Sequence, residues 1–137
     1  MESQEYLYET KVRDDLVDAM GHLNHASYLT IFEEARWDIC HAQNMTIESM
    51  QARGIGLVVI EAHIQYRREV RAGEGLLIKT RFRDVHRKLW RVEQTMENAA
   101  GQLCSHVQIK GGMFDLKERK MLLADSEWRA IFLGQKL

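Results

Sequence analysis

Proline is absent from this chain of 137 residues, although average usage of about 5% would place several there. Every turn must therefore be built from Gly, Asn, Asp or charged residues. Cysteine is scarce, with only Cys40 and Cys104. The N-terminus has no secretory signal pattern, and no apolar run approaches the roughly 18 residues of a membrane span. Together these absences predict a cytoplasmic protein with free thiols and no membrane segment.

The chain also carries almost no net charge. The 19 Lys and Arg residues balance 20 Asp and Glu residues, which gives a formal charge of −1. The broad positive field of a duplex-DNA binder is therefore absent, and nucleic acid is not an expected partner. Any anionic ligand must be met by a local basic cluster. The 45% hydrophobic and 28% charged fractions instead fit one globular domain over residues 1–137.

Hydrophobic periodicity predicts an α+β fold. Residues 6–13 alternate as a half-buried strand does, and residues 26–40 are apolar around most of a helical circumference, with Asn24 as a candidate N-cap. Alternation returns in residues 60–67, 78–83, 90–97 and 103–110. Short turns between these runs, at 72–75, 87–88 and 98–101, favour an antiparallel meander. We therefore expect a five-stranded antiparallel sheet wrapped around one long central helix, with a helical or irregular stretch over 47–56 and a short helix over 126–133.

The loop before the long helix is the first candidate site. It reads V-D-A-M-G-H-L-N-H over residues 17–25 and is followed by A-S-Y-L and F-E-E-A-R-W within residues 26–37. With the later Y-R-R at 66–68, these motifs resemble the hotdog-fold acyl-CoA thioesterases of the 4-hydroxybenzoyl-CoA thioesterase-like family, which includes bacterial short-chain and long-chain enzymes. The resemblance runs from about residue 6 to 132. It implies hydrolysis of an acyl-CoA substrate, no metal or redox cofactor, and a homodimer or homotetramer with its sites at subunit interfaces.

The resemblance also implies roles for two residues. Asp18 is the expected nucleophile or general base, and the backbone N–H of His25 is the expected donor to the carbonyl oxygen, with the His25 side chain as a secondary participant. The chemistry of a thioester agrees, because its carbonyl needs only a base or nucleophile, a water molecule and a group that holds the oxyanion. The choice between nucleophile and base stays open, as do the length and aromatic character of the acyl group.

Coenzyme A carries phosphates, so a chain without net positive charge must supply local cations. The turn at Arg87 and Lys88 resembles a basic turn that contacts the nucleotide in aromatic-CoA relatives, and we rank it above Arg67 and Arg68. A solvated hairpin tip is an almost equal alternative for Arg87 and Lys88. Tyr28 is a candidate for the acyl pocket, although an aromatic residue at helical spacing more often belongs to the core.

Other interpretations compete with catalysis by Asp18. A loop aspartate is often a simple turn former, and the chain could be a non-catalytic acyl-CoA sensor or carrier, or, with less support, a hotdog dehydratase. Another hotdog branch uses a carboxylate on the helix, and Glu33 and Glu34 are the candidates for that role here. We favour instead a pair on the helix surface that is balanced by Arg36 or the neighbours of Trp37. His22 and His25 have no third ligand at a recognised spacing, so a metal site is not expected.

Overall fold

The computed structural model of the protein describes residues 4–124 and 128–130. Within them, a single antiparallel sheet packs against one long helix, α1 (His25–Ala42). The strands are β1 (Tyr6–Lys11), β2 (Ile55–Tyr66), β3 (Gly75–His86), β4 (Leu89–Asn98), β5 (Leu103–Asp115) and β6 (Lys120–Leu122). A 3₁₀ turn, η1 (Asp14–Leu16), follows β1, and a short helix, α2 (Ile47–Ala52), follows α1. The expected α+β hotdog architecture is confirmed.

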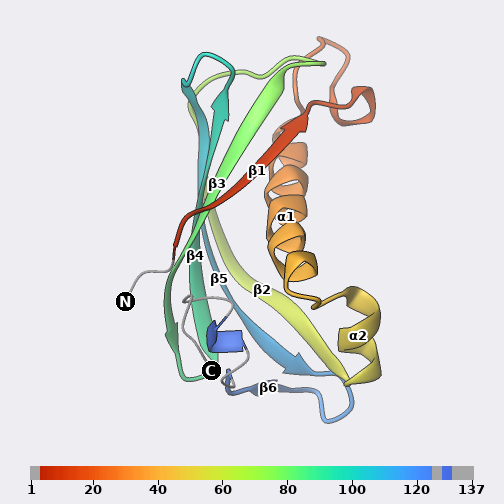
Figure 1. Ribbon diagram of the computed structural model, residues 1–137. Helices are drawn as coiled ribbons and strands as arrows, with labels where there is room; N and C mark the ends of the chain where they lie inside the picture. Colours follow the sequence, from red (N-terminus) through yellow and green to blue (C-terminus); the bar gives the residue numbers. More distant parts are fainter. Residues whose placement is uncertain (1–3, 125–127, 131–137) are drawn as a thin grey trace.

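The sheet curls around α1, which lies on its concave side (Figure 1). The helix begins where the sequence predicts, because the side chain of Asn24 accepts a hydrogen bond from the Ala26 amide. Its inward face packs into the core through its buried residues Tyr28, Ile31, Phe32, Ala35, Ile39 and Cys40. A helix held on this face by a curved sheet presents a fixed N-terminus, which is where the loop with Asp18 ends.

The position of β2 differs from the expected meander. The order of the strands is β1-β3-β4-β5-β2, so β2 pairs with β5 at the far edge and is not a hairpin partner of β3. The segment 67–74 therefore crosses the end of the sheet and does not form a tight turn. Val70 in this segment is completely buried, which anchors the crossing against the core. A short alternating run followed by Ala-Gly-Glu-Gly looks like a hairpin, because local pattern does not encode which strand is the neighbour.

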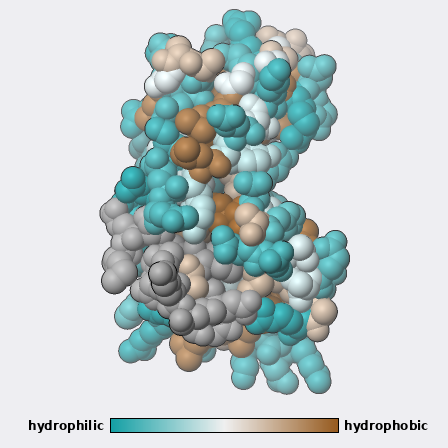
Figure 2. Space-filling view, in the orientation of Figure 1, coloured by the Kyte–Doolittle hydropathy of each residue, from teal (hydrophilic) through white to brown (hydrophobic). Residues whose placement is uncertain are grey.

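Strand β2 has an open edge. Among the described strands it pairs with β5 alone, and a register shift lies between Val59 and Glu61. Val59 and Ile60 are 51% and 50% exposed, unlike the alternating interior strands β3 and β4. The unpaired backbone of such a strand is a ready template for pairing with another strand. By contrast, the side of the molecule drawn in Figure 2 is mostly hydrophilic, with small scattered apolar patches.

Close packing between β4 and β5 depends on glycine. The Cα of Gly111 faces that of Trp90 across the two strands, and a Cβ atom there would lie 2.5 Å from the Trp90 ring and 2.5 Å from the Val58 carbonyl oxygen. Only glycine leaves room for the indole, which is buried beside β2. The ring of Trp90 is thereby fixed in place below α1.

Cys40 and Cys104 are both free thiols, as predicted. Residues 128–130 are helical, while the rest of the helix predicted over 126–133 lies outside the described residues. Strand β6 has no counterpart in the sequence prediction. In the described part of the chain, no helix combines the length and the apolar character needed to traverse a bilayer.

Candidate active site

Asp18 lies in a tight loop closed by backbone pairing. The Asp18 amide donates to the His22 carbonyl at 2.8 Å, and the Gly21 amide donates to the Asp18 carbonyl at 3.0 Å. Gly21 takes a φ of 81°, a left-handed conformation that disfavours side chains. The Asp18 Oδ1 accepts hydrogen bonds from the amides of Met20 at 2.9 Å and His22 at 3.2 Å. The turn-former interpretation of Asp18 is therefore correct for this oxygen.

The other carboxylate oxygen of Asp18 is different. Oδ2 makes no hydrogen bond or ion pair with any residue in the described ranges. The side chain is half-buried, so its orientation is fixed by Oδ1 while Oδ2 stays available. A carboxylate held in this way can take a proton from water or attack an electrophilic carbon.

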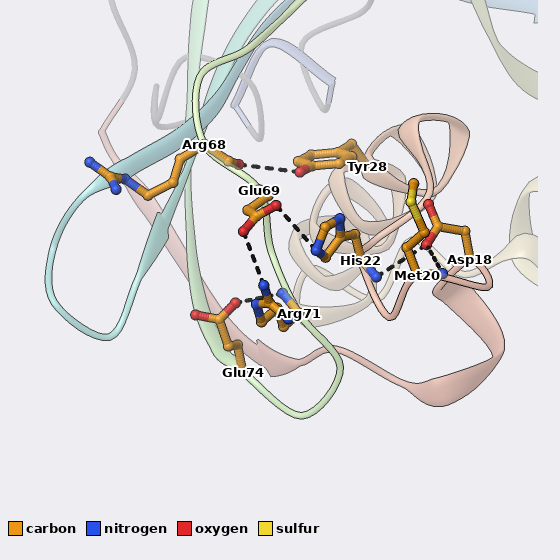
Figure 3. A network of polar contacts seen from close by, with 8 residues as sticks. All are labelled: Asp18, Met20, His22, Tyr28, Arg68, Glu69, Arg71 and Glu74. Carbon is orange, nitrogen blue, oxygen red and sulfur yellow. Dashed lines mark hydrogen bonds and ion pairs between the residues drawn. The ribbon is translucent and has the colours of Figure 1, made fainter.

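A polar network fixes this loop to the segment that follows β2 (Figure 3). The Leu23 amide donates to the Val70 carbonyl at 2.6 Å, and Nε2 of His22 lies 3.1 Å from a carboxylate oxygen of Glu69. Glu69 also contacts Arg71, at 3.3 Å. The loop is therefore fixed from two sides, since β1 precedes it and the segment 67–74 lies against it.

The N-terminus of α1 faces the same region. The Asn24 side chain occupies the Ala26 amide and the Asn24 carbonyl accepts from Ser27, but the His25 amide has no hydrogen-bond partner within 4–124 and 128–130. A free N–H at a helix N-terminus carries partial positive charge. It can therefore hold a negatively charged oxygen.

A groove of about 420 Å³ brings these groups together. Five of the residues proposed from the sequence line it, namely Asp18, His25, Tyr28, Arg67 and Arg68. Leu23, His22, Tyr66 and Glu69 complete the lining. The loop before α1, the first turn of α1 and the end of β2 thus form one site from three separate parts of the chain.

Two tyrosines join α1 to the end of β2. Their rings meet edge to face at 5.0 Å, the Tyr28 hydroxyl donates to the Arg68 carbonyl at 3.3 Å, and the Tyr66 hydroxyl donates to the His25 carbonyl at 2.9 Å. Tyr28 is only 4% exposed, and burial raises its pKa to about 12. It therefore serves the core and the wall of the groove at once, whereas Tyr66 is the more open of the two.

The cationic residues separate into two groups. Arg67 and Arg68 are exposed at the groove, although the Arg68 side chain points away from Asp18 in Figure 3. Arg87 and Lys88 form the exposed β3–β4 turn at the opposite end of the sheet from the loop (Figure 1). Within one chain, therefore, Arg67 and Arg68 lie at the groove, although from the sequence we ranked them below Arg87 and Lys88.

The competing carboxylates on α1, Glu33 and Glu34, do not line the groove. Glu34 forms a two-bond ion pair with Arg13, at 2.8 and 3.2 Å, so it is a surface pair, but its partner is Arg13 and not the expected Arg36 of the same helix. Glu33 is exposed on α1 away from the groove. Among the residues that the structure describes, no group of three His, Cys, Asp or Glu side chains has the arrangement of a metal site.

Sequence reasoning missed two contributors to the site. Tyr66 was visible in the Y-R-R motif, but its contact with the α1 N-terminus depends on the crossing of segment 67–74. Glu69 had no signal, because its pairing with His22 joins residues 47 positions apart. The groove holds a carboxylate oxygen and a helix amide that have no partner within the described ranges, and these groups suit attack on a carbonyl and stabilisation of its oxyanion.

Several known proteins are similar to this chain. A family model described as the thioesterase-like superfamily matches residues 12–132. The long-chain acyl-CoA thioesterase FadM of Escherichia coli K12 is 31% identical over 122 residues, which cover 88% of this chain and 92% of the relative.

Solved structures of thioesterases are also similar to this chain. The probable thioesterase YbaW from Escherichia coli has a TM-score of 0.78 at 30% identity, over 92% of this chain and 95% of that chain. A 1,4-dihydroxy-2-naphthoyl-CoA thioesterase from Synechocystis has a TM-score of 0.87 at 18% identity, over 94% and 96% of the two chains. At that lower identity, the second similarity concerns the fold alone.

Proposed function

The chain belongs to the thioesterase-like superfamily, and we propose that it hydrolyses acyl-CoA thioesters to a free carboxylic acid and CoA. The observation that carries this proposal is the groove in which the available Oδ2 of Asp18 and the free amide of His25 lie together. A non-catalytic acyl-CoA carrier has no use for an unpaired carboxylate next to an anionic ligand. The similarity to a named acyl-CoA thioesterase over 92% of that protein's length also favours hydrolysis.

The reaction needs one water molecule and two residues. Asp18 either takes a proton from the attacking water or attacks the carbonyl carbon itself, to give an anhydride that water then opens. In both routes the carbonyl oxygen becomes negative and accepts a hydrogen bond from the His25 amide. The C–S bond breaks, the CoA thiolate takes up a proton, and the carboxylic acid leaves. Loss of one oxyanion donor typically costs about 10²–10³ in rate.

The phosphates of CoA require cations near the groove. Arg67 and Arg68 are the candidates supplied by the same chain, since both line the groove and both are exposed. Arg87 and Lys88 remain candidates in an assembly, where a second copy would have to bring them to the nucleotide. Arginine suits this role because its planar group binds phosphate through two hydrogen bonds.

The open edge of β2 supports a homodimer. Antiparallel pairing of two β2 edges would continue the sheet through both subunits and cover Val59 and Ile60. If the pairing is centred on the mostly exposed residues 59–66, Tyr66 of one subunit lies opposite the partner's Val59. The groove would then lie at the subunit interface. We also propose a cytoplasmic location, which the two free, buried thiols support.

A thiol-release assay tests the function. Wild-type protein is mixed with short, long and aromatic acyl-CoAs in the presence of a thiol reagent. We expect release of CoA from at least one class, at a rate proportional to enzyme concentration. Binding of acyl-CoA by calorimetry, with no release from any class, would instead favour the sensor or carrier.

A further inference from the structure

A second cavity lies between the middle of α1 and the edge strand β2. Its volume is about 270 Å³, and apolar side chains line most of it, including Trp37, Leu57, Val58, Phe82 and Trp90. Cys40 contributes a thiol that burial keeps protonated, with its pKa raised to about 11. The cavity is therefore a pocket for a mainly apolar group.

One cation interrupts this apolar lining. Arg36 borders the cavity and is half-buried, and desolvation of its guanidinium lowers its pKa. Its one hydrogen bond to a described residue runs from Nη1 to Oε1 of Gln94, at 2.8 Å. A guanidinium has five N–H donors, so four lack a partner within the described ranges. Glu33, one turn away, also lines the cavity but is not within ion-pair distance.

Arg36 is held rigidly. Gln94 is completely buried and uses its amide nitrogen to donate to the Phe32 carbonyl and to Thr80 Oγ1, each at 3.0 Å. Its oxygen is thereby aimed at Arg36, and the guanidinium is fixed between α1 and the sheet. A desolvated cation with unused donors is stabilised by an oxygen acceptor, and a carboxylate is the best match to its fork of donors.

The cavity lies at a distance from the groove of its own chain. Arg36 is 11 residues after His25, which corresponds to about 16 Å along α1. Val59 also lines the cavity, whereas Tyr66 lines the groove. Pairing of two β2 edges about residues 59–66 would place the cavity of one subunit beside the groove of the other. A substrate held at one groove would then extend its acyl group into the partner's cavity.

We propose that the Arg36 cavity binds the far end of the acyl group in the neighbouring subunit's site, and that it selects an acyl chain ending in a second carboxylate. This inference rests on the proposed function and names its substrate class. The apolar walls take the methylene groups, and the guanidinium pairs with the terminal carboxylate. An acyl chain that ends in a methyl group would leave the cation buried and unpaired.

The test compares two acyl-CoAs of equal carbon number, one ending in a methyl group and one in a carboxylate. In wild type we expect kcat/KM for the carboxylate-ended substrate to be higher by about 10- to 100-fold, the value of a charge-assisted hydrogen bond. Arg36→Met should remove this preference and retain hydrolysis of the methyl-ended substrate. Arg81→Met serves as the control, because Arg81 lies between the buried Thr80 and Phe82 and so faces the other side of the sheet.

Mixing an inactive variant, Asp18→Asn, with a non-selective variant, Arg36→Met, tests the placement between subunits. In a heterodimer of Asp18→Asn and Arg36→Met chains, one site would combine an intact Asp18 with the partner's intact Arg36. Refolding the two variants together should therefore restore carboxylate selectivity, in at most half of the heterodimer's sites. Restoration would be absent if Arg36 served its own chain's groove.

The outcomes separate this inference from the proposed function. Wild-type hydrolysis without preference for the carboxylate-ended substrate would overturn the inference and leave the thioesterase intact. A binding experiment replaces the kinetic test if neither substrate is hydrolysed or if Arg36→Met fails to fold. Wild type and Arg36→Lys are titrated with a linear dicarboxylate, and the fluorescence of Trp37 and Trp90 is the readout. Saturable quenching that weakens in Arg36→Lys supports the cavity, and the absence of any change in wild type overturns it.

Discussion

Asp18 and His22 hold each other through two hydrogen bonds: the Asp18 amide donates to the His22 carbonyl at 2.8 Å, and the His22 amide donates to Asp18 Oδ1 at 3.2 Å. This reciprocal pairing fixes the carboxylate relative to the α1 N-terminus without using Oδ2. The proposed catalysis by Asp18 therefore depends on the loop residues between them.

Gly21→Ala tests the geometry of this loop. A left-handed conformation costs a residue with a side chain about 1–2 kcal/mol, so we expect a stability loss of that size. Displacement of Asp18 should also lower kcat by about 10- to 100-fold. Gly101→Ala is the matched control, since Gly101 has a similar φ of 77° in the β4–β5 turn and also has open space around it. It should lose the same stability in a urea titration and keep its kcat. Equal activity in the two variants would contradict the role of the loop.

The carboxylates on α1 should be dispensable. Glu34→Gln removes the ion pair with Arg13, whose partly exposed partners make it worth about 1 kcal/mol or less. Glu33→Gln removes an exposed charge. Both variants should retain kcat on a methyl-ended acyl-CoA within about twofold, because neither carboxylate lines the groove. A large loss of kcat in either variant would favour the helical carboxylate as the catalytic group.

The two basic clusters make different predictions for binding. Arg67→Met should raise KM for acyl-CoA by about tenfold, the value of one charged hydrogen bond to phosphate. The effect should shrink at high salt, which screens exposed charges. The double substitution Arg87→Met and Lys88→Met raises KM only if a second copy presents this turn to the nucleotide. Steady-state kinetics at two salt concentrations distinguishes the clusters, and an unchanged KM in Arg67→Met would remove it from the site.

Cys40 predicts a fall in stability at alkaline pH. Burial raises its thiol pKa from 9.0 to about 11, so between these values the unfolded chain releases a proton that the folded chain keeps. Stability from this group is therefore complete below pH 9 and declines as pH rises to 11, by about 2–3 kcal/mol in total. Urea titrations at pH 8 and pH 11 should show a smaller difference in Cys40→Ala than in wild type. An identical pH dependence in both proteins would contradict this assignment.

Much of the local structure could be predicted from the sequence. Asn24 caps α1 as its position before the apolar run indicates, and the alternation in β3 and β4 corresponds to buried and open positions. These features depend on residues close together in the chain. The loop with Asp18 and the first turn of α1 are adjacent in sequence, so their juxtaposition was also predictable.

The remainder depends on contacts that sequence periodicity does not record. The far-edge position of β2 follows from its pairing with β5, and the burial of Val70 in the following segment was not predicted from the sequence. The contact between His22 and Glu69 joins residues 47 positions apart, and the hydrogen bond between Arg36 and Gln94 joins residues 58 positions apart. Such pairs arise only when the sheet closes around the helix.

The most direct test of the central claim is the turnover of Asp18→Asn in the thiol-release assay, with Asp15→Asn from the neighbouring η1 turn as the control. Asparagine retains a side-chain oxygen for the Met20 and His22 amides, so the loop should keep its shape and its thermal midpoint. We predict that kcat falls by at least about 10²-fold in Asp18→Asn and is unchanged in Asp15→Asn. A folded Asp18→Asn protein with wild-type kcat would contradict the account.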